Sequence, residues 1–414
     1  MPDRDRALSA IDPRRFGRWA AARLEASASG RAVLRWWPYA VLPALALFAG
    51  LTPQLFSTRL MFISVLAVTY VLMSARTNLF SIAVAAVMLA YLPVEMDTFE
   101  RGIMFNIALY TLLGIGLNVV VGYAGLLDLG YVAFFATGAY LYALLTGPSR
   151  GGGFDTGIPF WVVLPMALLL ASLVGVALGI PVLRLRGDYL AIVTLGFGEI
   201  IRIMLNNNPN GLTQGPQGVF GLPDTSILNT SITTPFEYYY LILAGCLIAA
   251  FATERIRGSR VGRAWEAIRE DEDVAASMGI DTTLYKLLAF AIGAAIGGAG
   301  GVVFAAKQGS VFPSDFDLNV SINVLALVII GGMGNVRGVL LGAFLLIGLP
   351  DVLRDFSVNL GFAQFNNIGQ DYRLVIFGAA LVSVMVLRPE GLLPSRRRAA
   401  EFGHAEELEA EAAT

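Results

Sequence analysis

Apolar residues gather into long runs along this chain, and polar residues are confined to the short segments between them. A straight membrane-crossing helix needs about 20 consecutive apolar residues. Several of the runs are shorter than this and are interrupted by glycine or proline. The pattern therefore predicts an all-α polytopic membrane protein with about 10–12 transmembrane helices, some of them short or broken. The runs are 38–52, 60–75, 79–92, 102–121, 125–146, 160–183, 188–205, 237–252, 285–306, 320–333, 337–353 and 371–387.

One polar stretch, residues 253–281, is the longest charged segment between two apolar runs. Five of its residues are spaced so that they fall on roughly one side of a helix. This spacing predicts a short amphipathic helix that docks onto a partner at one side of the membrane. A solvated loop with a single helical turn is an equally open interpretation. The five residues are Trp265, Ile268, Ala275, Met278 and Gly279.

Composition agrees with a membrane protein. Of the 414 residues, 56% are hydrophobic and only 14% are charged, whereas about a quarter of a soluble domain is charged. Arginine-rich segments favour the cytoplasmic side, and alternate counting of the runs puts five such segments and both termini there. The segments are the N-terminus, Arg76, Arg184 with Arg186, the Arg255–Arg269 cluster and Arg396–Arg398.

The same count predicts three parts of the chain. Residues 1–35 form a basic cytoplasmic extension, residues 36–394 form the membrane domain, and residues 395–414 form a cytoplasmic tail. The loops at 147–159 and 206–236 are expected outside. No cleavable signal pattern precedes the first apolar run, which starts too late for a signal peptide.

Motifs of enzymes and of nucleotide-binding proteins are absent from the sequence. The only lysines, Lys286 and Lys307, do not follow glycine, so there is no P-loop. The single histidine, His404, lies in the acidic tail, and the single cysteine, Cys246, lies in an apolar run. We therefore expect no enzyme activity, no metal site and no cofactor bound by this chain.

Ionisable residues are rare inside the apolar runs, and such residues usually face a partner or a pathway. Asp128 and the pair Glu199 and Arg202 stand out. Glu199 and Arg202 are three residues apart, so on a helix they can also simply pair with each other. Glycine-rich segments at 114–140, 291–306 and 329–343 indicate close helix packing, or a broken helix beside a pathway. The runs at 320–333 and 337–353, which GGMGN separates, are expected to be joined by a tight turn.

The sequence resembles a known family in several ordered segments. LGIGLNVVVGYAGLLDLGYVAFFATGAYLYALL (113–145) resembles the permease subunits of bacterial branched-chain amino acid ABC transporters, the LivM type. The segment 185–223, which reads LRGDYLAIVTLGFGEIIRIMLNN and continues to LTQGPQGVFGLP, resembles them as well. GRAWEAIREDEDVAASMGID (262–281) is similar to that family's cytoplasmic loop. LALVIIGGMGNVRGVLLGA (325–343) and YRLVIFGAALVSVMVLRPEGLL (372–393) are similar to its C-terminal part. The resemblance covers roughly residues 100–395.

The resemblance implies a permease in the bacterial inner membrane that works within an assembly. A second, related permease completes the translocation pathway, two cytoplasmic ATPases bind the ATP, and a periplasmic binding protein delivers the substrate. No nucleic acid is expected as a partner, and membrane lipid surrounds the helices. Residues 253–283 become the coupling loop, which docks on an ATPase. The residues carried over for this contact are Glu266, Asp273, Ala275, Ala276 and Gly279.

Pathway-lining residues are expected among the polar and small residues of the membrane segments. The candidates are Asn118, Tyr131, Thr194, Gly196 and Glu199. Two alternatives stay open for the function as a whole. One is a permease for urea or short amides, which the same resemblance allows. The other is a stand-alone carrier or a membrane enzyme, which predicts intramembrane carboxylate or histidine clusters that the sequence lacks.

Overall fold

The computed structural model describes residues 98–148, 156–183, 188–208, 213–227, 230–232 and 234–348, with short pieces elsewhere. The chain divides into two compact units, Met1–Glu100 with Leu349–Leu392, and Arg101–Gly348 with Leu393–Thr414. Almost all described residues belong to the second unit. The predicted basic extension, the runs between 38 and 92, most of the run at 371–387 and the predicted tail lie outside the described residues.

Helices make up nearly all of the described part of the second unit, which confirms the all-α membrane fold. Five of them are long and apolar enough to cross a membrane, and three apolar helices are shorter. The helices are α6 (Thr98–Leu117, continued by the π-helical turn η2, Asn118–Tyr123), α7 (Val132–Thr146), α8 (Phe160–Val182), α9 (Asp188–Asn206), α10 (Pro235–Arg257), α11 (Arg260–Glu270), α12 (Glu272–Ser277), α13 (Thr282–Gln308), α14 (Leu318–Gly331) and α15 (Val336–Ala343, continued by η7, Phe344–Gly348).

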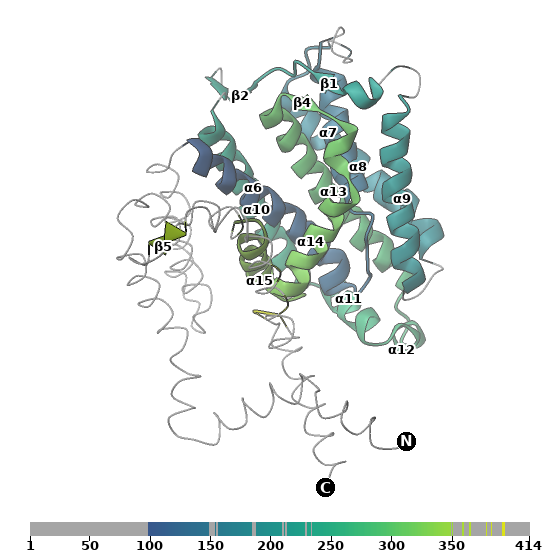
Figure 1. The fold of residues 1–414 in the computed structure, drawn as a ribbon. Helices are drawn as coiled ribbons and strands as arrows, with labels where there is room; N and C mark the ends of the chain where they lie inside the picture. The colour runs from purple at the N-terminus through teal and green to yellow at the C-terminus, as the bar shows by residue number, and fades with distance from the viewer. Residues whose placement is uncertain are drawn as a thin grey trace, which may run out of the picture. The chain divides into compact units, whose positions relative to one another are not determined.

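Short strands and 3₁₀ turns occupy the connections. Strand β1 (Val219–Phe220) pairs antiparallel with β4 (Ser310–Val311), and β2 (Thr225–Ile227) pairs with β3 (Thr230–Ile232). The 3₁₀ turns are η5 (Gly215–Gln217) and η6 (Pro313–Phe316). Figure 1 shows β1 and β4 at one end of the helices, and α11 and α12 at the other. In the first unit, β5 (Val358–Asn359) pairs with β6 (Gln364–Phe365).

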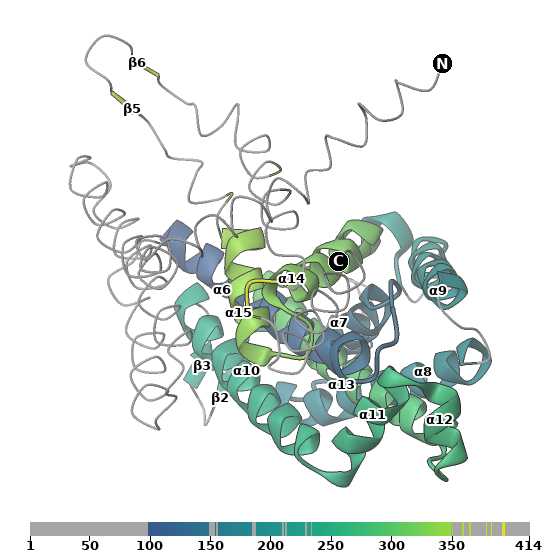
Figure 2. The same cartoon turned by 90° about the horizontal axis from the view of Figure 1, so that it is seen from below.

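Helix α13 is the centre of the packing, with α7 and α8 against it (Figure 2). Small residues allow this close contact. A Cβ atom on Gly138 of α7 would overlap the carbonyl oxygen of Gly298 on α13, so the two backbones touch. Ala294 of α13 is fully buried as well, and a Cβ atom on Gly175 of α8 would lie only 2.7 Å from its Cβ. Tight packing, one of the two roles left open for the glycine-rich segments, is therefore observed here.

Broken helices occur in two of the three glycine-rich segments, those at 114–140 and 329–343. The apolar run at 125–146 is not helical throughout, because residues 124–131 form an irregular segment before α7. The Tyr131 hydroxyl donates to the carbonyl of Gly293, 2.9 Å away in α13, so α7 begins level with the interior of that long helix. The sequence also predicted a tight turn between the runs at 320–333 and 337–353. Residues 332–335 form that turn between α14 and α15.

Candidate functional site

Helix α11 is held against its own chain by its apolar side. Ser259 caps the helix and accepts a hydrogen bond from the amide of Val261 at 3.2 Å. Trp265 is completely buried, and its Nε1 donates to the carbonyl of Tyr285, 2.7 Å away at the start of α13. Ile268, one turn further along α11, is buried as well. This side of the stretch is therefore covered by the chain itself.

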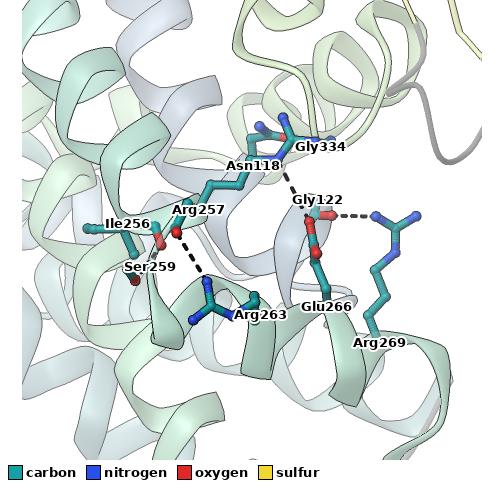
Figure 3. Close-up of polar contacts among 10 residues, drawn as sticks. Asn118, Gly122, Ile256, Arg257, Ser259, Arg263, Glu266, Arg269 and Gly334 are labelled. Carbon is teal, nitrogen blue, oxygen red and sulfur yellow. Dashed lines mark hydrogen bonds and ion pairs between the residues drawn. The ribbon is translucent and has the colours of Figure 1, made fainter.

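Polar contacts fix α11 to two further elements, as Figure 3 shows. The Arg269 guanidinium donates to the carbonyl of Gly122, 2.6 Å away in the π-helical turn that ends α6. Arg257, at the end of α10, lies 3.9 Å from the Glu266 carboxylate. Because α11 contacts the ends of α6 and α10 and the start of α13, it moves only when these helices move.

Helix α12 is a separate short helix, because Asp271 ends α11 and caps α12. The Asp271 carboxylate accepts from the amides of Asp273 and Val274 at 2.9 and 3.0 Å. Gly279 follows the helix with φ of +84°, a left-handed conformation that L side chains rarely adopt. Asp281 then caps α13 by accepting from the amide of Leu284 at 3.0 Å.

An ion pair ties α12 to α13. Lys286 Nζ lies 2.5 Å from Glu272 Oε1, and the two side chains are 5% and 27% exposed. No contact was predicted from the sequence for Lys286 or for Glu272. Lys286 could have been noticed as a lysine just inside an apolar run. Its partner could not, because the two lie fourteen residues apart, which matches no contact within one helix.

The outer side of α12 is apolar and exposed. Met278 is 79% exposed and Val274 is 58% exposed. Because they are four residues apart, the two side chains lie on one side of the helix and form what we call the α12 face, whereas the exposed Ala276 lies on another side. The prediction of a single apolar side for Trp265, Ile268, Ala275, Met278 and Gly279 is therefore wrong, because the stretch turns at Asp271. The first three side chains are buried and the last two residues are exposed.

The residues predicted to contact an ATPase occupy three different positions. Asp273, Ala276 and Gly279 are exposed on α12 or at its end, Ala275 is buried beneath them, and Glu266 is half-buried beside Arg257. Asp273, Ala276 and Gly279 are therefore accessible to a partner, and their contact with an ATPase stays a prediction. The buried Ala275 has a packing role instead.

Three of the predicted pathway residues are buried and stabilise the backbone. Asn118 Oδ1 accepts from the amide of Gly334 at 2.8 Å (Figure 3), which joins the end of α6 to the turn between α14 and α15. The Thr194 hydroxyl accepts from the amide of Leu129 at 3.0 Å. Tyr131 donates to α13 as described above. Asn118 and Thr194 thereby satisfy backbone amides that would otherwise be unpaired in an apolar environment, and the Tyr131 hydroxyl satisfies its own hydrogen-bond donor.

The remaining candidates lie on or beside α9. Gly196 is half-buried. Glu199 forms the predicted ion pair with Arg202, whose Nε lies 3.0 Å from both carboxylate oxygens. Asp128, by contrast, is fully buried in the irregular segment before α7, where its Oδ1 accepts from the amide of Gly130 at 2.9 Å.

Comparison with known proteins identifies the class of this fold and site. A family model described as branched-chain amino acid transport system, permease component, matches residues 101–385. The chain therefore belongs to this family of multi-pass transport permeases, and the prediction made from its motifs is confirmed.

Individual relatives agree with the family. The chain is 38% identical over 347 residues to the high-affinity branched-chain amino acid transport system permease protein LivM of Salmonella typhimurium, an alignment that covers 78% of this chain and 76% of the relative. It is 42% identical over 311 residues to the LivM protein of Escherichia coli, covering 70% and 68%. A probable LivM protein of Methanocaldococcus jannaschii is 26% identical over 324 residues, covering 71% and 93%. No solved structure matches this chain.

Proposed function

We propose that this chain is the permease subunit of an inner-membrane ABC importer for branched-chain amino acids, and that α12 is its coupling helix. The observation that carries the second part is the α12 face. An apolar surface formed by Val274 and Met278 is exposed at the polar end of two membrane-crossing helices. At that position it faces water unless a soluble partner covers it. The ATPase of an importer is such a partner.

The proposed assembly contains four other chains. A second permease completes the pathway, two ATPases bind the ATP, and a binding protein delivers the substrate on the opposite side. This chain holds no P-loop, so we assign ATP binding to the ATPases and propose no cofactor for the chain itself. The proposed orientation sets α11, α12 and both termini in the cytoplasm, in agreement with the arginines at 255–269.

Mechanically, the anchoring of α11 and α12 makes them suited to transmit a movement. A hydrogen bond from Trp265 holds the loop on α13, and one from Arg269 holds it on the end of α6. The ion pair between Glu272 and Lys286 holds α12 on α13. A displacement of α12 by ATPase closure would therefore be passed to both helices instead of being absorbed by a flexible loop. ATP and the loaded binding protein supply the energy difference between the states, because a ligand shifts an equilibrium only by binding its states differently.

The coupling proposal is tested by Met278→Glu in the assembled importer. A carboxylate in the centre of the α12 face is expected to reduce copurification of the ATPases and uptake of leucine at least tenfold. The matched control is Arg260→Glu, which puts the same side chain on an exposed position in the first turn of α11, where the helix dipole tolerates it. Normal uptake by Met278→Glu would contradict the docking role.

The substrate is tested separately. The importer with its cognate binding protein is expected to accumulate leucine and to exclude urea. The relatives above, all named for branched-chain amino acid transport, do not favour the urea alternative. Uptake of urea without leucine would leave the permease assignment standing and overturn its substrate.

A further inference from the structure

A row of polar side chains crosses three neighbouring helices, where the membrane span would otherwise be apolar. We call this row the polar strip. No member is fully buried, and Asn106 and Asn319 are exposed. Its members are Asn106 and Tyr110 of α6, Asp317 just before α14, Asn319 and Asn323 of α14, and Glu199 and Arg202 of α9.

The members of the polar strip are close enough to form one continuous surface. Figures 1 and 2 both show α14 between α6 and α9. The Tyr110 side chain of α6 lies near the Asn323 side chain of α14. The Asn319 amide donates to the Asp317 carboxylate at 2.6 Å, and Asp317 interacts electrostatically with Arg202 of α9. The strip therefore runs from α6 across the start of α14 to α9.

The polar strip lies within the membrane-crossing part of the fold. The first turn of α14 lies beside the start of α7, because the amide of Val132 donates to the Ser321 hydroxyl at 3.0 Å. Phe316 packs on Phe135 and Tyr140 of α7, with ring centroids 5.1 and 5.8 Å away. On α9, Glu199 is ten residues beyond Tyr189, about 15 Å along the helix axis.

Helix α9 separates its polar residues from its apolar ones. Ile192, Ile200 and Ile203 are exposed along one ridge of the helix. At 100° per residue, Glu199 lies at the edge of that ridge, and Arg202 lies further round the helix on the flank where it interacts electrostatically with Asp317, just before α14. Charged side chains in a membrane face protein or a water-filled cavity instead of lipid. The ridge is therefore compatible with lipid, whereas the polar flank is not.

We propose that the polar strip is the part of the translocation pathway that receives the charged ends of the amino acid. The Glu199 carboxylate pairs with the substrate α-ammonium group and the Arg202 guanidinium pairs with its α-carboxylate. Between passages, the two side chains pair with each other, as they do in the structure. Ile322, 46% exposed among the asparagines of α14, offers an apolar contact for a branched side chain. This inference rests on the proposed function.

The partial exposure of Glu199 and Arg202 allows the amino acid to leave the polar strip as well as to bind there. The Glu199 and Arg202 side chains are 39% and 35% exposed, so water and salt weaken each charge interaction made there. An exchange of one ion pair for two pairs with a zwitterion then changes the free energy little in either direction. A pathway needs such weak binding, because a substrate held tightly would not leave.

The experiment uses the complete importer, with both permeases, both ATPases and the binding protein, in liposomes. The variants are Glu199→Gln and Arg202→Gln, together with the exchanged pair Glu199→Arg with Arg202→Glu. Each is expected to reduce leucine uptake at least tenfold, with ATP hydrolysis stimulated by the binding protein within twofold of the unmodified importer. The control, Ile200→Leu on the apolar ridge, is expected to transport normally.

Each alternative outcome overturns the inference in a recognisable way. If the exchanged pair transports normally, the two residues form only a structural ion pair. If the second permease no longer copurifies, the polar strip is an interface between subunits. If Glu199→Gln and Arg202→Gln both transport normally, the charges do not contact substrate. A variant that fails to insert is replaced by Asn319→Ala, whose exposed side chain is expected to contribute severalfold to uptake. Absence of leucine uptake by the unmodified importer would instead refute the proposed function.

Discussion

The ion pair between Glu272 and Lys286 predicts an asymmetric effect of removing its two members. Lys286 is 5% exposed, whereas Glu272 is 27% exposed and lies in the first turn of α12. Glu272→Gln leaves an ammonium group almost fully buried without its carboxylate partner. Lys286→Met leaves a carboxylate that reaches water and is favoured by the helix dipole. Glu272→Gln should therefore lower the free energy that holds α12 on α13 much more than Lys286→Met does.

Magnitudes follow from this difference in exposure. Removing one member of a fully buried pair costs about 3–5 kcal/mol, and the partial exposure of Glu272 reduces this to about 2–3 kcal/mol for Glu272→Gln. For Lys286→Met we expect about 1 kcal/mol or less, because the lost pairing is offset by an apolar side chain in a buried position. The double variant is expected to match Lys286→Met, since the stranded charge is gone in both.

Hydrogen exchange of the backbone amides of α12 measures these values directly, because the pair holds α12 on α13. At 1.4 kcal/mol for each factor of ten, Glu272→Gln should speed exchange by about 30- to 150-fold, and Lys286→Met by less than about tenfold. In the assembled importer, Glu272→Gln is also expected to hydrolyse ATP without matching uptake. Equal effects of the two single changes, or a double variant worse than Glu272→Gln, would refute the reasoning.

Two further predictions concern the packing of α11 and of α7 against α13. Trp265→Phe removes the hydrogen bond to the Tyr285 carbonyl but keeps most of the apolar contact, so we expect a loss of about 1 kcal/mol, measured as faster exchange in α11; unchanged exchange would contradict the anchoring role. Gly138→Val sets a branched side chain against the Gly298 backbone, and we expect little folded protein in the membrane fraction, whereas Gly102→Ala, at a position with open space around its Cβ, should accumulate normally. Normal accumulation of Gly138→Val would show that α7 and α13 can separate.

Features that depend on neighbours in the sequence could be predicted from it. The apolar runs at 160–183 and 188–205 correspond closely to α8 and α9, because length and composition decide membrane insertion. The Glu199–Arg202 pair and the turn at 332–335 were also found, since each involves residues within one helical turn or one loop. These contacts need no knowledge of the tertiary structure.

Contacts between distant segments could not be predicted. Spacing alone identified Trp265 and Met278 as apolar residues of one stretch, but not that Trp265 faces its own chain and Met278 faces outward. That division depends on the Tyr285 carbonyl and on the turn at Asp271. Asn118 and Thr194 looked like pathway residues for a related reason. An irregular backbone inside a membrane needs hydrogen-bond partners, and these two side chains supply them.

Helix α14 connects the polar strip to a turn that contacts the end of α6, next to α11. Its last residue precedes the turn that carries Gly334, whose amide is held by Asn118 one turn before Gly122. Gly122 in turn accepts the hydrogen bond from Arg269 of α11. The start of α14 carries Asn319 and Asn323 of the strip.

Helix α14 contacts the end of α6 beside α11 through the turn that follows it, and it also carries part of the polar strip. When α11 moves, a rigid α14 can therefore change the width of the polar strip, or which of its side chains pair, without a flexible segment in between. Such a link is a physical route only if the helix has two stable positions that both ends influence. The contact between Asn118 and Gly334 is a suitable hinge for this, because a single hydrogen bond can break and reform while the closely packed pair of α14 and α15 moves as a unit. The close backbone contacts that require glycine in α14 and α15 would then make the displacement of this pair all-or-none. Closely packed helices shift between discrete arrangements more readily than they deform continuously.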